Sequence, residues 1–129
     1  SPEIEIAKSI QRKLEAPGAL DSVPFADNKI RLLEILIRDD CKSIDIKFNE
    51  LTKKYPKLEA NIIGINRDGK FFIPKKTDTV KINDKIYVII NSTQMAETLE
   101  AFGHQEKISK NILIIGGGNI GYNLAIIPL

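Results

Sequence analysis

The chain has 129 residues, of which 43% are hydrophobic and 28% charged, which is typical of a folded protein with one compact domain and flanking pieces. Its net charge of +2 shows no concentrated basic stripe, and the lysine pairs at 53–54 and 75–76 are interpreted as solvated faces, so nucleic acid is not an expected partner. No apolar run reaches the roughly 18 to 20 residues that span a bilayer, and one cysteine, Cys41, with one histidine, His104, indicates neither a disulfide nor a metal cluster.

The first predicted element is an amphipathic helix at the start of the chain. Ser1, Pro2 and Glu3 are typical of a helix opening, because they supply a capping hydroxyl, a proline at the first helical position and an acid favourable to the helix dipole. The apolar stripe that follows consists of Ile4, Ile6, Ala7, Ile10 and Leu14. Such a stripe must be buried against the following domain or a second copy of the chain. Because the chain opens without a methionine and closes inside a motif, it is expected to be cut from a longer protein at both ends.

Residues 28–103 are predicted to form a domain of their own. A near-continuous apolar run from Ile30 to Ile37 predicts a strand that is covered on both faces. The stretch "FNELTKKY", residues 48–55, predicts a short helix that Pro56 ends. The mixed residues before this domain, 17–27, are interpreted as a hinge.

A hairpin and a final strand–helix unit complete the predicted domain. Strands near 62–65 and 71–73 flank Asp68-Gly69, a two-residue turn that favours a tight hairpin. The β-rich stretch 85–90 predicts a strand, and a helix capped by Asn91 or Ser92 follows it. Strands and helices mix without strict alternation, so the predicted class is α+β, with a mostly antiparallel sheet and two helices.

This predicted domain shows no catalytic constellation. Asp39 and Asp40 are adjacent carboxylates, but they sit beside Arg38 and Lys42 in a polar stretch that is interpreted as a solvated turn. There is no nucleophile elbow or phosphate loop in the sequence of the domain. By elimination, the domain is interpreted as a regulatory or interaction module, and no enzyme activity is expected.

A glycine motif stands near the end of the chain. Gly116, Gly118 and Gly121 have the spacing that opens a dinucleotide-binding βαβ unit, with Asn119 and Ile120 between them, and residues 111–115 predict the strand before it. A short helix is expected after the glycines. The acidic residue that binds a ribose and the neighbouring parallel strand have no room in the remaining residues. We therefore expect an incomplete nucleotide site and no cofactor bound by this chain alone.

The order of five motifs resembles the TrkA family of regulators of bacterial potassium uptake. These motifs are "PEIEIAKSI", "PGALDSVPFADNKIRLLEI", "DGKFFIP", "DKIYVI" and "ILIIGGGNIG", which together cover essentially the whole chain. The family is built from two tandem copies of a Rossmann-like RCK domain followed by a smaller RCK C-terminal domain. The resemblance implies that 1–27 closes one Rossmann domain, 28–103 is an RCK C-terminal (TrkA-C) domain, 104–110 is a linker and 111–129 begins a second Rossmann domain.

The same resemblance implies a cytoplasmic gating subunit, peripheral on the inner face of the membrane. It implies NAD(H) or ATP as the cofactor, with the five residues Gly116, Gly118, Asn119, Ile120 and Gly121 contributing to its site. It also implies a membrane-embedded potassium-translocating subunit as the partner and assembly into a homodimer or larger homo-oligomer. Two alternatives stay open: a small-ligand sensor domain of another transporter, for example one that binds a cyclic dinucleotide, and a fragment of an NAD-dependent oxidoreductase.

Overall fold

The computed structural model describes residues 2–15, 29–102, 112–117 and 125–126. Its elements, in chain order, are α1 (Pro2–Glu15), β1 (Ile30–Leu36), α2 (Phe48–Lys54), β2 (Ala60–Arg67), β3 (Lys70–Phe72), β4 (Lys85–Asn91), the 3-10 turn η1 (Ser92–Gln94), α3 (Met95–Phe102), β5 (Ile112–Gly117) and β6 (Ala125–Ile126). The six strands form one sheet in the order β3-β2-β4-β1-β5-β6, and each neighbouring pair is antiparallel. The predicted α+β class with a mostly antiparallel sheet is confirmed.

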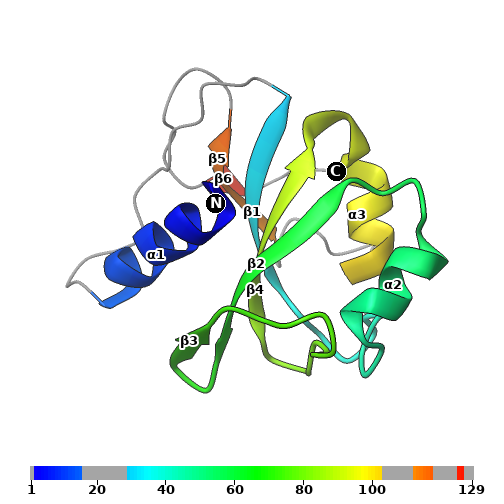
Figure 1. The fold of residues 1–129 in the computed structure, drawn as a ribbon, viewed down its shortest axis with the longest axis horizontal. Helices are drawn as coiled ribbons and strands as arrows, with labels where there is room; N and C mark the ends of the chain where they lie inside the picture. The colour runs from blue at the N-terminus through cyan, green and yellow to red at the C-terminus, as the bar shows by residue number, and fades with distance from the viewer. Residues whose placement is uncertain (1, 16–28, 103–111, 118–124, 127–129) are drawn as a thin grey trace.

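The sheet is covered on both faces. Figure 1 shows α1 on one side of the sheet and α2 with α3 on the other. Successive residues of β1 point to opposite faces, so that Leu32 packs in the cluster under α1 and Leu33 in the cluster under α2 and α3. Both side chains are fully buried, which confirms that this strand is covered on both faces.

The apolar stripe of α1 is buried within the chain. Ala7 and Ile10 have no exposed surface and pack with Ile63 of β2 and Tyr87 of β4. The stripe was expected to pack on the following domain or on a second copy of the chain, and the structure shows that it packs on the following domain. Ile4, at the start of the helix, stays 44% exposed. None of the described helices is both long and apolar enough to cross a membrane.

The predicted hairpin forms with the predicted turn. Asp68 and Gly69 both have positive φ, 52° and 79°, as a two-residue turn between twisted strands requires. Next to the hairpin, the ring of Phe71 lies directly over Gly64, at a distance where any Cβ would collide with it. Gly64 therefore permits the short strand β3 to lie close to β2.

The strand of the glycine motif belongs to the same sheet as the domain before it. β5 pairs with β1, with Ile112 opposite Ile35, and β6 pairs with the outer edge of β5. At Ala125–Ile126 the sequence predicted a helix, and this prediction is wrong, because the structure has a strand there. The physical reason is that the outer edge of β5 leaves backbone groups that a short antiparallel strand pairs, while Pro128 disfavours a helix through these residues. The predicted division of the chain into 1–27, 28–103, a linker at 104–110 and 111–129 stays a prediction.

Candidate functional site

A pocket of 370 Å³ opens on the side of the sheet that carries α2 and α3. Its apolar lining consists of Phe48, Leu51, Leu58, Ala60, Ile62, Pro74, Ala101 and Phe102, and its polar lining consists of Asn49, Thr52, Tyr55, Asn61, Lys75 and Lys76. The lining comes from α2, the start of β2, the end of α3 and the segment after β3. Such a combination of apolar surface with a few polar groups is typical of a small-molecule site.

The segment after β3 is fastened to the start of α2. The backbone N–H of Phe48 donates to the carbonyl of Asp78 at 3.0 Å, and that of Asn49 donates to the carbonyl of Lys76 at 2.9 Å. The Asp78 carboxylate in turn accepts from the backbone N–H of Lys75 at 2.6 Å. These bonds fix both lysines on the pocket rim.

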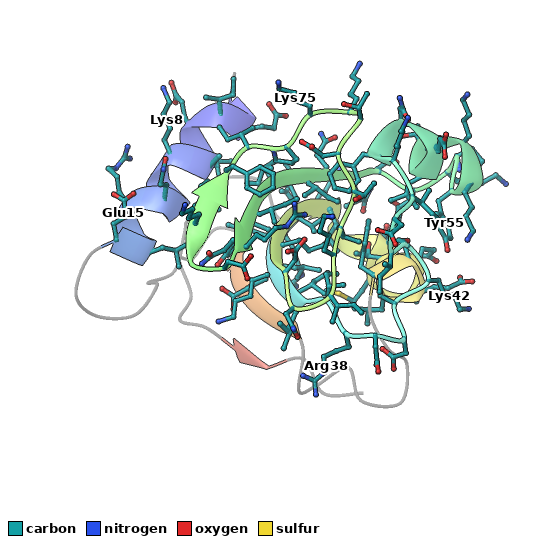
Figure 2. The ribbon with its side chains drawn as sticks, turned by 90° about the horizontal axis from the view of Figure 1, so that it is seen from below. Lys8, Glu15, Arg38, Lys42, Tyr55 and Lys75 are labelled. Atoms are coloured by element: carbon teal, nitrogen blue, oxygen red, sulfur yellow. The ribbon has the colours of Figure 1, made fainter. Side chains whose placement is uncertain are left out.

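Lysines from both pairs, which were interpreted separately from the sequence, lie in the lining of this pocket or beside it. Lys75 and Lys76 line it directly. Lys54 lies over the ring of Tyr55, with its Nζ 5.6 Å from the ring centroid, and Tyr55 lines the pocket too. Burial and, to a smaller extent, the charge of Glu100 raise the pKa of Tyr55, so its phenol stays neutral near pH 7. Figure 2 shows Lys75 and Tyr55 at the surface of this part of the molecule. The pocket thus combines aromatic surface with positive charge.

An ion pair attaches the end of β2 to the connection between β3 and β4. Arg67 donates from Nε and Nη2 to the two carboxylate oxygens of Asp84, at 2.9 and 2.8 Å, and from Nη2 to the carbonyl of Thr79 at 3.0 Å. Asp84 is 1% exposed, and its hydrogen bond raises the pKa of Arg67. By its local sequence, Asn83-Asp84, this residue is typical of a turn. The pairing was missed because Arg67 lies 17 residues away at the end of another strand.

The residues of the predicted nucleotide site are only partly described. Gly116 lies in β5 opposite Leu32, with its backbone in the sheet. The four other predicted site residues, Gly118, Asn119, Ile120 and Gly121, lie outside the described residues. The structure therefore shows the strand of the motif, and its role in binding a cofactor stays a prediction.

Cys41 lies in the turn region after β1, outside any helix or strand, and its side chain is buried in the domain interior. It is 7% exposed, its thiol donates to the carbonyl of Ala101 at 3.6 Å, and burial raises its pKa. In the part of the chain that the structure describes, no group of three or more His, Cys, Asp or Glu side chains is placed to hold a metal ion. His104 lies outside that part.

Comparison with known proteins identifies the central part of the fold. The model of the TrkA-C domain matches residues 32–103, which hold most of β1, all of β2 to β4 and the helices that line the pocket. This chain belongs to the TrkA-C domain family. The Trk system potassium uptake protein TrkA of Azorhizobium caulinodans is 38% identical over 125 residues, which are 97% of this chain and 27% of that protein. The TrkA homolog 2 of Methanosarcina mazei is 30% identical over 126 residues, again 27% of its length.

The TrkA-C chain therefore spans about a quarter of the curated relatives that it matches. Among solved structures, the BusR protein of S. agalactiae in complex with its busA-promotor DNA is similar with a TM-score of 0.50 and 20% identity, over 76% of this chain and 48% of that one. The RCK_C domain dimer of the same BusR in complex with c-di-AMP has a TM-score of 0.49 and 21% identity, over 57% of this chain and 91% of that one. At this identity, the likeness to the DNA complex concerns the fold alone.

Proposed function

We propose that this chain is part of a regulatory subunit of a potassium uptake system, cytoplasmic and peripheral on the inner face of the membrane. The observation that carries the proposal is the similarity to TrkA proteins over 97% of the chain at 38% identity. The partner is a membrane-embedded potassium-translocating subunit. The domain acts by conformational coupling and has no catalytic role.

In the longer protein, NAD(H) or ATP binds the Rossmann domains. Gly116, Gly118 and Gly121 bring the backbone close to the phosphates of this nucleotide, and Asn119 and Ile120 complete the turn. The nucleotide shifts the subunit between two arrangements only by its different affinity for each of them. The TrkA-C domain then transmits the shift between subunits.

A homodimer is part of this proposal, but its support differs from what the sequence offered. The apolar face of α1, for which a second copy was one of the two expected partners, is buried inside the chain. What supports a second copy now is a shallow hollow between α1 and β2, where Ile4 and Ile73 are 44% and 47% exposed. Light scattering at high micromolar concentration tests it, and a strict monomer contradicts it. Ile73→Ser lowers the dimer fraction if this surface is used.

Complementation with the full-length gene tests the proposed function. The gene is introduced, with its cognate membrane subunit, into a strain that lacks its own potassium uptake systems. We expect growth at low potassium with both genes and slower uptake with the membrane subunit alone. Equal uptake with and without the gene contradicts the regulatory role. A catalytic domain after the glycine motif would instead support the oxidoreductase alternative.

The pocket favours a second candidate function, a sensor of a small anionic ligand. Lys75 and Lys76 provide positive charge beside the aromatic side chains of Phe48 and Tyr55, which suits a ligand with phosphates and flat bases, such as a cyclic dinucleotide. Calorimetry with c-di-AMP, NADH and ATP tests this role in the chain itself. We expect binding of the cyclic dinucleotide that weakens at least tenfold in Lys75→Gln/Lys76→Gln.

The matched control for that double variant is Lys53→Gln, which removes one exposed lysine outside the pocket lining. It leaves binding within about twofold, because an exposed charge beyond the pocket contributes little. Equal weakening in the control and the pocket variant points to a diffuse charge effect and contradicts the pocket. NADH binding by this chain contradicts the expectation of an incomplete nucleotide site. The expected absence of a nucleic-acid partner stays a prediction, tested by gel shift with duplex DNA.

A further inference from the structure

The side chain of Gln94 holds the segment that forms one wall of the pocket. Its Nε2 donates to the carbonyl of Lys57 at 2.7 Å, and its Oε1 accepts from the backbone N–H of Glu59 at 2.7 Å. A glutamine amide has one donor and one acceptor side, as a peptide group has, so Gln94 pairs with this segment as a neighbouring strand would. Leu58, between the two bonded residues, lines the pocket.

Gln94 is also fixed to α3. It is the last residue of η1, directly before Met95, where α3 begins. The hydroxyl of Thr98, one turn into the helix, donates to the carbonyl of Gln94 at 2.8 Å. A movement of the wall at Leu58 therefore reaches α3 through one side chain.

The far end of α3 forms another wall of the same pocket. Ala101 and Phe102 line it and are 1% and 5% exposed. The carbonyl of Ala101 accepts from the hydroxyl of Ser43 at 2.5 Å and from the thiol of Cys41 at 3.6 Å. Since the helix has only eight residues, about 12 Å in length, it moves as one rigid body between these two attachments.

We propose that α3 is the coupling element of the pocket and that Gln94 is its positioning residue. A ligand that displaces the Leu58 wall pulls on Gln94, shifts α3 and changes the contacts of Ala101 and Phe102, beyond which the chain continues toward β5. Coupling of this kind is reciprocal, so loss of the contacts at one end of α3 also weakens the contacts at its other end. The inference rests on the proposed role of the pocket as an effector site, but its test requires no effector.

Cys41 is the only cysteine of the chain and therefore reports on the far end of α3. The test compares the rate at which a thiol reagent modifies Cys41 in the wild-type chain, in Gln94→Met and in the control Glu97→Met on an exposed part of α3. Gln94→Met keeps the length of the side chain and removes both hydrogen bonds to Lys57 and Glu59. We expect modification about tenfold faster in Gln94→Met and unchanged in the control. Urea unfolding of each variant gives the change in global stability.

The increase in the modification rate of Cys41 in Gln94→Met must exceed the increase that its loss of global stability would cause. If modification accelerates only as much as the free energy of unfolding predicts, Cys41 is reached by global unfolding and the coupling role of α3 is overturned. The reverse experiment uses Ser43→Ala, which removes the bond to Ala101 at the other end. We expect faster hydrogen exchange at the Glu59 amide, by roughly threefold or more beyond the global change. Unchanged exchange at Glu59 also overturns the proposal, whereas neither result affects the potassium-uptake assignment.

Discussion

The two faces of the sheet are covered in different ways. On one face, the single helix α1 lies over a small cluster. In this cluster the ring centroids of Phe71 and Tyr87 are 5.9 Å apart. On the other face, α2 and α3 cover a larger cluster and leave the lysine-rimmed pocket between them and the connection that follows β3. The two faces of the sheet therefore have different roles. One face binds α1 and so attaches the start of the chain, and the other face, under α2 and α3, holds the candidate site. Substitutions on the two faces should therefore have different kinds of effect.

The largest effect is expected in the centre of the α2/α3 face. Leu99→Ala removes a side chain that is 2% exposed in the main cluster. We expect a loss of about 3 kcal/mol in the free energy of unfolding, because buried Leu-to-Ala changes leave a cavity. Urea unfolding followed by circular dichroism should show one cooperative transition at lower urea with an unchanged slope. A second, separate transition would show that this face is not the cooperative core.

The next largest effect is expected at the ion pair of Arg67 with Asp84. Asp84→Ala leaves the Arg67 guanidinium without its carboxylate and frees the backbone N–H of Lys81, which donates to Asp84 at 2.8 Å. The Arg67 side chain is 27% exposed and can regain water in the variant. We therefore expect the free energy of unfolding to fall by about 2 kcal/mol, less than for a fully buried pair. Asp39→Ala, at an exposed position in the turn after β1, is the control for removal of a carboxylate. If both variants lose the same stability, the buried pair has no special role.

The α1 face should respond locally. Ile10→Ala removes a fully buried side chain from the contact of α1 with the sheet. The loss cannot exceed the free energy with which α1 is attached, so we expect about 1.5 kcal/mol at most and release of the helix. Hydrogen exchange should accelerate in residues 3–14 and stay unchanged in β4. Acceleration in both places would show that α1 and the sheet unfold as one unit.

The sequence predicted most elements because local signals agreed with the tertiary structure. Asp68-Gly69 fixed the hairpin turn, and Asn91 caps the turn before α3 by accepting from the N–H of Thr93. The apolar run of β1 indicated that both faces of this strand are buried. Its polar residues, at 31 and 34, are half-buried, whereas its central apolar residues are fully buried. These features depend on neighbours a few residues apart, which a sequence displays directly.

The candidate site could not be predicted in this way, because its parts meet only through long-range contacts. Nothing local indicates that Lys75 and Lys76 reach the start of α2, or that Gln94 pairs with a segment 35 to 37 residues before it. The pairing of β5 with β1 was missed for the same reason, as the glycine motif alone indicated a different, parallel sheet. Both lysine pairs were therefore interpreted as solvated, although the fold places Lys75 and Lys76 in the lining of a pocket.

The smallest effect, and the one that distinguishes the faces by pH, concerns Tyr87. Its hydroxyl donates to Oε2 of Glu34 at 2.8 Å, and burial, followed by the charge of Glu34, raises its pKa far above that of an exposed tyrosine. Because the folded state keeps this phenol neutral, its contribution is fully present below the unfolded pKa of about 10 and is lost as the pH rises above that value.

Tyr87→Phe should therefore cost about 1 kcal/mol at pH 7, where it removes the hydrogen bond to Glu34. At pH 11, the wild-type chain loses roughly 1.4 kcal/mol that the variant does not, because only the wild-type unfolded state gains by ionising residue 87. Urea unfolding at pH 7 and pH 11 should show the stability difference vanish or reverse. Cys41 and Tyr55 titrate in both chains and cancel from the comparison. A difference that stays constant between the two pH values would mean that water reaches the Tyr87 hydroxyl, and that α1 does not seal its face of the sheet.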